Sequence, residues 1–528
     1  MRHTQYVRYD NRFHRPHRRK PDYALRVMVG LTVVLVTAVV VLLLVTLLKR
    51  DADQPNGTQA PSTSTQTQTD TQTSGIVIAT PTPTEQPQRQ PHQNEVLYPA
   101  TAKMNVSIGQ PASDVSPSSR GVSQDVLSGE SKISPYSRDP KIRFSDPIDY
   151  QTVAGILTFR GNHFRNCASW GTTSVTDGAL EQVWEYRNIG SMPSSEWAFP
   201  WTGTGWTGQP LVVQWPWDIQ LKMNMYSEKR IKQGLTEVIQ AAMDGKIYFF
   251  DLDDGQPTRD PIKVGATIKG TPAIDPRGYP LLYVGQGDNN GADGKIGFRI
   301  YNLIDGSLLH FQTGKDSRAH RSDWGACDSS PLFNLETDTL IYPSENGLIY
   351  TVKLNTFFDS GSGVVSVKPE TIVYRYLING VSGRSIGVES SMSVYDHYGY
   401  FADNSGNLYC VDLNTFTMIW VKQLDDDADV TPVLEEENGR VFLYIGTEVD
   451  WQKGPGDYMG ASYTYKIDAM TGEEVWQTSQ SCWTHNGEKT GDDINGGMLG
   501  TPIVGKKSIS DLVIFSYCMT KGRYSGNR

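Results

Sequence analysis

The chain has 528 residues, enough for one large domain or for several domains of ordinary size. Its formal net charge of -10 argues against a general nucleic-acid-binding protein, because phosphate recognition needs a basic face. The five Cys residues are too few for a disulfide scaffold, and no two of them form a CxxC pair.

The N-terminus combines a basic segment with a long apolar one. Residues 1–26 carry eight Arg and Lys side chains, whereas residues 27–48 carry no charged side chain. A helix of this length crosses about 30 Å of hydrocarbon, so we predict a single transmembrane helix at 27–48. The excess of positive charge before it predicts a cytoplasmic tail at 1–26 and an extracytoplasmic location for the rest. A cleaved signal peptide and a buried core helix are the alternatives.

Residues 49–140 have a different composition, dominated by Thr, Ser, Gln and Pro. Such a segment buries too little apolar surface to offset the loss of chain entropy on folding. We therefore predict a disordered linker that holds the next domain away from the membrane.

The region 141–528 is repetitive. An apolar run begins directly after six marks, each a Pro or Met that follows a Gln, Thr or Ser: Pro210, Pro272, Pro331, Met392, Pro432 and Pro502. The shortest interval between marks is 40 residues, about what four short strands need. The expected fold class is all-β, a β-propeller of four-stranded blades with six repeats visible.

A turn of the form Asp-x3-Gly-x3-Trp follows four of the strands. The best copy is Asp468, Gly472 and Trp476. The other copies begin at Asp251, Asn302 and Asp412, and the last of these keeps Trp420. Asp and Gly are typical turn residues, and we expect the Trp to pack into the neighbouring sheet and join blade to blade.

These repeats resemble the pyrroloquinoline-quinone (PQQ)-like β-propeller family, within the quinoprotein alcohol dehydrogenase-like superfamily. Residues 157–162 and 180–186 are similar to segments common at the start of such domains, and the resemblance covers about residues 150–528. It implies seven or eight blades. Because the sixth repeat stops before its last strands, we expect a propeller that is incomplete at its C-terminus. The fold alone does not specify an activity, because it serves both dehydrogenases and assembly lipoproteins.

The resemblance also implies what an enzyme of this kind would need. Quinone-dependent dehydrogenases of this fold use an acidic base, a Ca²⁺ ion held by carboxylate and amide oxygens, and often a disulfide between adjacent Cys residues. Here no two Cys residues are adjacent. We therefore predict no cofactor, metal ligand or catalytic residue, and keep a PQQ- and Ca²⁺-dependent dehydrogenase as an alternative.

Two groups of residues are candidates for ligand binding. Lys269, Asp328, Glu389 and Asp429 each stand three residues before a mark, where loops should open toward the central channel. They are predicted to surround the channel mouth and bind a cation or a polar ligand. The alternative is that turns favour Asp and Glu without bringing them together. A second group is a candidate surface for stacking a sugar or a peptide, unless packing between blades explains it: Trp201, Trp206, Trp215 and Trp217.

These features predict a membrane-anchored, extracytoplasmic propeller that acts as a non-catalytic binding or scaffolding module. The expected partner is a protein or a cell-envelope glycan, and not a nucleic acid. An extracytoplasmic sensor domain is a further alternative to the dehydrogenase.

Overall fold

The computed structural model describes residues 108–169, 178–194, 199–205, 208–291, 293–452, 456–485 and 494–520. The chain divides into two units, residues 1–85 and 86–528, and every described residue belongs to the second. The predicted cytoplasmic tail and the apolar segment at 27–48 lie outside the described residues. Among the residues that are described, no helix is long and apolar enough to span a membrane.

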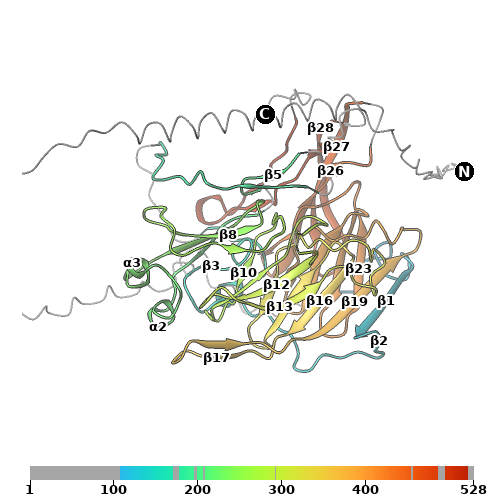
Figure 1. Cartoon of the computed structure of the whole chain (residues 1–528). Helices are drawn as coiled ribbons and strands as arrows, with labels where there is room; N and C mark the ends of the chain where they lie inside the picture. The colour runs from blue at the N-terminus through green and yellow to red at the C-terminus, as the bar shows by residue number, and fades with distance from the viewer. Residues whose placement is uncertain are drawn as a thin grey trace, which may run out of the picture. The chain divides into compact units, whose positions relative to one another are not determined.

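The described residues form five antiparallel sheets of four or more strands (Figure 1). The first contains β3 (Gly155–Ile156), β6 (Leu211–Val213), β7 (Glu237–Ala241), β8 (Lys246–Asp251) and β9 (Ile262–Lys263). The second contains β10 (Ala273–Ile274), β11 (Leu281–Val284), β12 (Gly297–Asn302) and β13 (Leu308–Thr313). The third contains β14 (Leu332–Asn334), β15 (Thr339–Pro343), β16 (Leu348–Lys353), β19 (Glu370–Ile378), β1 (Val122–Ser128) and β2 (Ser131–Lys132).

The fourth sheet contains β20 (Ser393–Tyr395), β21 (Tyr398–Asp403), β22 (Asn407–Asp412) and β23 (Thr417–Gln423). The fifth contains β24 (Val433–Glu437), β25 (Arg440–Gly446), β27 (Tyr458–Asp468) and β28 (Glu474–Thr484). The remaining strands form pairs: β4 (Ser191–Met192) with β5 (Trp201–Thr202), β17 (Phe357–Asp359) with β18 (Val364–Ser366), β26 (Glu448–Val449) with β29 (Gly496–Gly497), and β30 (Ile503–Val504) with β31 (Val513–Ile514). Two short helices, α2 (Trp217–Gln220) and α3 (Ser227–Arg230), lie between β6 and β7.

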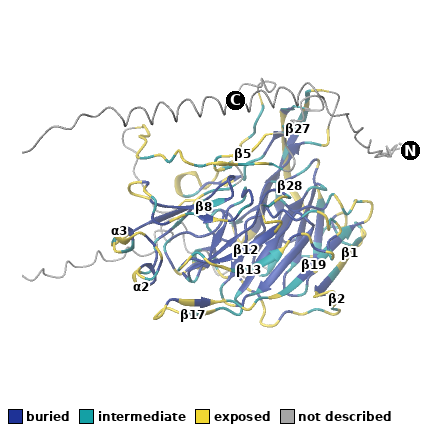
Figure 2. Cartoon of the chain, in the orientation of Figure 1, coloured by how far each residue is buried: buried dark blue, intermediate teal, exposed yellow. Residues whose placement is uncertain are grey.

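Consecutive sheets pack face to face, and each pair encloses an apolar core of its own. Between the second and third sheets, for example, the rings of Phe298 and Tyr342 stack with centroids 4.5 Å apart. Figure 2 shows the result as strands that are buried along most of their length. Sheets that pack in sequence order in this way form a β-propeller, and the described residues contain five of its blades. The predicted all-β propeller of four-stranded blades is therefore confirmed.

The six sequence marks set the frame of the repeat. Each mark directly precedes the first of the consecutive strands that build one repeat: β6, β10, β14, β20, β24 and β30. The sixth of these strands belongs to the two-stranded sheet formed by β30 and β31. The expected total of seven or eight blades stays a prediction.

The Asp-x3-Gly-x3-Trp motif forms the turn after the third strand of a blade. In the fifth blade the Gly472 amide donates to the Asp468 carbonyl at 2.9 Å, and Asp468 Oδ1 accepts from the Met470 amide at 2.9 Å. Gly472 has φ of +73°, a conformation that glycine adopts without strain. In the fourth blade Phe416 takes the same place with φ of +50°.

Trp side chains from earlier in the chain pack against this turn. Trp420 is buried, its indole Nε1 donates to the Ala469 carbonyl at 3.0 Å, and its ring covers Gly472. Trp184 makes the same contact on the first sheet, where its Nε1 donates to the Leu252 carbonyl at 2.8 Å. The predicted role of the Trp is thus confirmed for Trp420, whereas Trp476 remains 36% exposed.

This contact predicts different costs for two glycine substitutions. Gly472 and Gly439 both have positive φ, but a Cβ at Gly472 would lie 2.9 Å from the Trp420 ring, whereas a Cβ at Gly439 meets open space. Gly439→Ala should lower the free energy of unfolding by about 1–2 kcal/mol through backbone strain alone. Gly472→Ala should lower the free energy of unfolding by about a further 1–3 kcal/mol, the cost of overpacking, because its methyl group presses on the Trp420 ring. Urea unfolding measures both losses. Equal losses would show that the Trp420 contact does not hold the blades together.

Residues 155–167, which we term the hub segment, bond to the first strands of several blades. The segment begins with β3, which pairs with β6 of the first blade. The Leu157, His163 and Phe164 carbonyls then accept from the amides of Ile274, Val394 and Leu434 in the second, fourth and fifth blades. Thr158 Oγ1 donates to the Pro331 carbonyl at the third blade, at 3.0 Å. The hub segment therefore crosses the centre of the propeller and ties its blades together.

Ordered structure also begins earlier than the sequence suggests. Strand β1 pairs with β19 over seven residues and extends the third sheet, and its Val126 and Leu127 are buried. The prediction that the disordered linker extends to residue 140 is therefore wrong for the described part of that range. The apolar pattern of β1 is short and lies within a polar sequence, so composition alone did not separate it from the linker.

Candidate functional site

The strand register brings charged residues from several blades to one end of the sheets. In each of four blades the first two strands are antiparallel, with Ala273 opposite Tyr283, Leu332 opposite Ile341, Ser393 opposite Tyr400, and Val433 opposite Tyr444. The same register can be extended by four residues, back before the first strand and on past the second. It then places Lys269 opposite Gly287, Asp328 opposite Glu345, Glu389 opposite Asn404, and Asp429 opposite Glu448. Residues opposite one another in an antiparallel pair lie on the same face. The positions before the first strand and after the second strand therefore converge.

We term the resulting group the acidic cluster: Asp328, Glu345, Glu389, Asp427, Asp429 and Glu448, together with Lys269. The Lys269 ammonium lies 3.3 Å from Asp328 Oδ2. The charges of Glu389 and Lys269 act on both Asp328 and Asp429, so the four residues singled out in the sequence share one electrostatic environment. A glycine permits the close approach, because a Cβ at Gly287 would lie 2.1 Å from Asp328 Oδ1.

Several oxygens of this group are buried without a hydrogen-bond donor. Glu345 and Glu448 are each 3% exposed, and one carboxylate oxygen of each has no hydrogen-bond partner. Asp328 Oδ1 is in the same state. Asn404 and Asn495 donate their amides to Glu389 and Glu448 at 2.7 and 2.8 Å, which leaves their own side-chain oxygens without a partner. Buried polar atoms are rarely left unpaired, so this arrangement calls for a ligand that supplies donors.

Desolvation raises the pKa of five cluster carboxyls: Asp328, Glu345, Asp427, Asp429 and Glu448. The neighbouring carboxylates raise these pKa values further, whereas the Lys269 ammonium opposes the rise at Asp328. The Asp429 and Glu448 carboxyls lie within hydrogen-bonding reach of each other, an arrangement that requires a shared proton or a cation. A cationic ligand would therefore compete with protons for these carboxyls.

The three Trp candidates that the structure describes do not form one surface. Trp201 lies at the acidic cluster, where its Nε1 donates to Asp288 Oδ2 at 2.7 Å and its ring faces the Lys269 ammonium at 4.7 Å. Trp217 is exposed at the start of α2. The surface prediction is wrong for Trp215, which is 5% exposed because it packs in the core and donates to Glu237. Trp206 lies outside the described residues.

Sequence reasoning missed three residues that follow the second strands: the cluster residues Glu345 and Glu448, and Asn404, which donates to Glu389. Each follows the second strand of a blade and precedes the turn to the third. Their signal was available, because an antiparallel hairpin returns the chain to the end where its first strand began. The marks locate only the first strand of each repeat, so they do not indicate which residues of the second strand lie opposite it.

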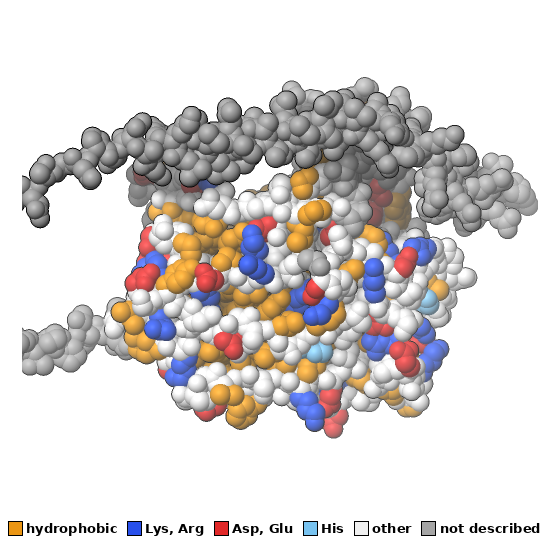
Figure 3. All heavy atoms as spheres, in the orientation of Figure 1, with side chains coloured by type: hydrophobic (Ala, Val, Ile, Leu, Met, Phe, Trp, Pro, Cys, Tyr) orange, Lys and Arg blue, Asp and Glu red, His pale blue; other side chains and the backbone are white. Residues whose placement is uncertain are grey.

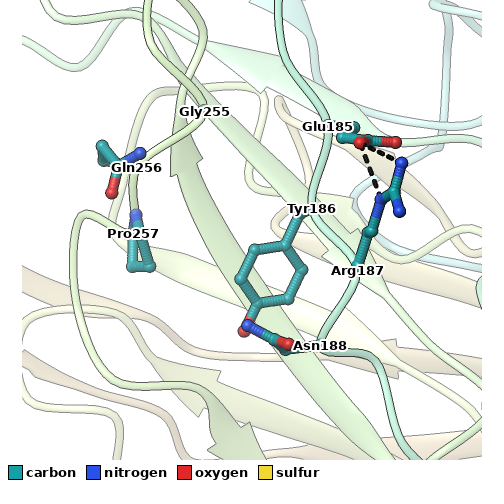
Figure 4. Close-up of a pocket in the computed structure, with 7 residues that line it drawn as sticks. All are labelled: Glu185, Tyr186, Arg187, Asn188, Gly255, Gln256 and Pro257. Carbon is teal, nitrogen blue, oxygen red and sulfur yellow. Dashed lines mark hydrogen bonds and ion pairs between the residues drawn. The ribbon is translucent and has the colours of Figure 1, made fainter.

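Other parts of the surface offer less. A pocket beside the first blade is lined by Glu185, Tyr186, Arg187, Asn188, Gly255, Gln256 and Pro257 (Figure 4). Its one ion pair, between Glu185 and Arg187, joins two exposed side chains. On the face shown in Figure 3, acidic and basic side chains are interspersed, in contrast to the acidic cluster.

The PQQ and Ca²⁺ of the alternative enzyme can be tested against these residues. Within the described ranges, no three His, Cys, Asp or Glu side chains are placed to hold a metal ion. The cysteines in those ranges are all single thiols, so the disulfide of adjacent Cys residues has no counterpart. The residues do not fit a quinone–calcium site of that kind, and we derive no step through either group.

Comparisons with known proteins give little further guidance. No protein-family model matches the chain, and no curated protein matches it. Among solved structures, the chain is similar to BamB from Moraxella catarrhalis, with 17% identity over 55% of this chain and 71% of that chain, and a TM-score of 0.29. It is also similar to a europium-containing methanol dehydrogenase, with 10% identity over 68% of this chain and 88% of that chain, and a TM-score of 0.35. Similarity at this level carries no argument about activity or partners.

Proposed function

We propose that this chain is a membrane-anchored, extracytoplasmic propeller that binds a protein or cell-envelope partner through a primary ammonium group. The observation that carries the proposal is the set of buried carboxylate oxygens without donors in the acidic cluster. An ammonium supplies three N–H donors and a positive charge, which are what this group of oxygens lacks. The anchor at 27–48 and the location outside the membrane are part of the proposal and rest on the sequence.

The structure offers its own example of such a ligand. The ammonium of Lys269 lies between the Trp201 ring and the Asp328 carboxylate, at 4.7 and 3.3 Å. An aromatic face and a carboxylate together are a typical environment for an ammonium group. One lysine cannot compensate six carboxyls when they ionise, which favours a second cation supplied by a partner.

The test is a calorimetric titration of the full chain in detergent with a blocked Gly-Gly-Lys-Gly-Gly peptide. We expect saturable binding that weakens with added salt, because the attraction is electrostatic. The same peptide with an acetylated lysine should not bind, because acetylation removes the charge. Equal binding of both peptides, or binding of neither by folded protein, would contradict the proposal.

A steric variant locates the binding on the protein. Gly287→Ala places a methyl group 2.1 Å from Asp328 Oδ1 and 2.4 Å from Lys269 Cγ, so both side chains must move. We expect it to weaken binding of the lysine peptide at least about tenfold, the equivalent of ~1.4 kcal/mol. Gly361→Ala, in the exposed turn between β17 and β18, is the matched control and should bind normally. Unchanged binding by Gly287→Ala would place the ligand elsewhere.

A further inference from the structure

Two of the five cysteines lie together beside the fifth blade. Cys482 belongs to β28, and Cys518 forms an antiparallel bridge with Gly497 of β29. The Cys518 amide donates to the Gly497 carbonyl at 2.9 Å, and the Trp483 amide donates to the Met519 carbonyl at 2.9 Å. The segment that carries Cys518 is therefore hydrogen-bonded to Trp483, which follows Cys482, and to Gly497, whose neighbour Gly496 lies against Cys482.

The two thiols share one backbone group. The Gly497 amide interacts with both the Cys482 and the Cys518 sulfur. Burial, and then the charge of Cys518, raise the pKa of Cys482 to about 11. Glycine at position 496 leaves the necessary room, because a Cβ there would lie 3.3 Å from the Cys482 Cβ.

The remaining three cysteines have different surroundings. Cys167, Cys327 and Cys410 are buried in the described structure. Cys327 Sγ lies 3.0 Å from Ser344 Oγ, and Cys410 lies against the Tyr400 hydroxyl in the core between the fourth and fifth blades. Cys518 is only partly buried, so an oxidant can reach the pair from its side.

We infer that Cys482 and Cys518 form a disulfide when the folded chain meets a disulfide donor, such as a thiol–disulfide oxidoreductase or oxidised glutathione. One cysteine thiolate attacks the donor disulfide and forms a mixed disulfide, and the other then displaces the second donor sulfur. The two cysteines are oxidised to one S–S bond, and the donor is reduced to two thiols that take up the two protons. Such bonds persist outside the cytoplasm, where we place this domain.

The bond would restrain a segment that reaches the acidic cluster. The chain between Cys482 and Cys518 includes β29 and Asn495, whose amide donates to Glu448 Oε2 at 2.8 Å. Closing a loop of this length reduces the entropy of the unfolded chain, so oxidation should raise Tm by about 5 °C. The inference does not depend on the proposed ligand, because mass spectrometry detects the disulfide directly.

The test treats the folded full chain with oxidised glutathione, then denatures it and alkylates the thiols that remain. We expect three alkylated cysteines instead of five, and one cross-linked peptide that joins Cys482 to Cys518 after digestion with trypsin. Cys518→Ser should abolish the cross-link and the gain in Tm. The matched control, Cys327→Ser, should keep both. Five alkylated cysteines in wild-type protein, or a cross-link to any other cysteine, would overturn the inference.

Discussion

Replacing one acid of the cluster by its amide should stabilise the protein at pH 8 while abolishing ligand binding. Glu448 is 3% exposed and lies against Asp429, and both carboxyls have raised pKa values because of desolvation and mutual repulsion. Glu448→Gln removes one of these charges and keeps the shape of the side chain. We expect the free energy of unfolding at pH 8 to rise by about 1–2 kcal/mol.

The sign of the pH dependence follows from proton binding. Unfolded Asp and Glu ionise near their ordinary pKa values of about 4, whereas the folded cluster keeps its protons to higher pH. The folded state then binds more protons than the unfolded state, so its stability falls as pH rises through the raised pKa values. Wild-type Tm should therefore fall from pH 5 to pH 8, and the fall should be smaller in Glu448→Gln.

A neighbouring acid provides the matched control. Asp426 is fully buried, and its Oδ1 accepts from the Asp427 and Trp451 amides, each at 2.8 Å, while Oδ2 accepts from Gln452 at 2.8 Å. Asp426→Asn replaces an acceptor by a donor and should lower stability by about 1–3 kcal/mol at both pH values. If Glu448→Gln also lowers stability at pH 8, Glu448 is a structural residue and the cluster is not a ligand site.

An increase in stability together with loss of binding would show that the acidic cluster is a ligand site and not an ordinary part of the core. Most substitutions of buried residues destabilise, and the exceptions concentrate at sites where a ligand normally compensates the strain. The lysine peptide should accordingly stabilise wild-type protein more than Glu448→Gln. A shift of the same size in both proteins would contradict this explanation.

Much of the propeller could be predicted from the sequence because its repeat is marked by local chemistry. Each mark directly precedes a first strand, and the Asp468 and Gly472 positions form the turn that their residue types predict. Strand β1 could not be placed in this way. Its pairing with β19 joins residues far apart in the chain, so neither local propensity nor periodicity indicates it.

Only half of the candidate site could be predicted from the sequence. Asp328 and Asp429 share a position in the repeat, which the marks made visible. Their partners Glu345 and Glu448 depend on the length of the hairpin between the first two strands, and this length differs between blades. The burial that leaves carboxylate oxygens without donors depends on packing between blades, which no single repeat contains.

The hub segment carries the second large prediction, which concerns Arg165. This residue is fully buried, and its guanidinium donates to the Met392 carbonyl at 2.9 Å and to the Phe159 carbonyl at 2.8 Å. It also donates to Thr158 Oγ1 at 2.8 Å and to the Ser330 carbonyl at 3.3 Å. One side chain thus ties the hub segment to the residues that begin the third and fourth blades.

Arg165→Met should lower the free energy of unfolding by about 3 kcal/mol or more, because it leaves buried carbonyls without donors. Arg165→Lys should also destabilise, since an ammonium cannot reach acceptors spread around a planar guanidinium. Burial lowers the pKa of Arg165 to about 10, a value that still keeps it charged at neutral pH. Urea unfolding of the full chain measures both losses.

Arg160 is the control for this prediction. It belongs to the same segment and is partly buried, and its guanidinium donates to the Pro502 carbonyl at 2.7 Å. Arg160→Met should cost only about 1 kcal/mol, because the Arg160 side chain is partly exposed to water, whereas Arg165 is fully buried. A loss at Arg165 no larger than this would mean that the hub segment fills the centre of the propeller without holding its blades in register. Asp328 and Glu389 lie two and three residues before the Ser330 and Met392 carbonyls that Arg165 binds, so their placement would then depend on contacts between neighbouring blades alone.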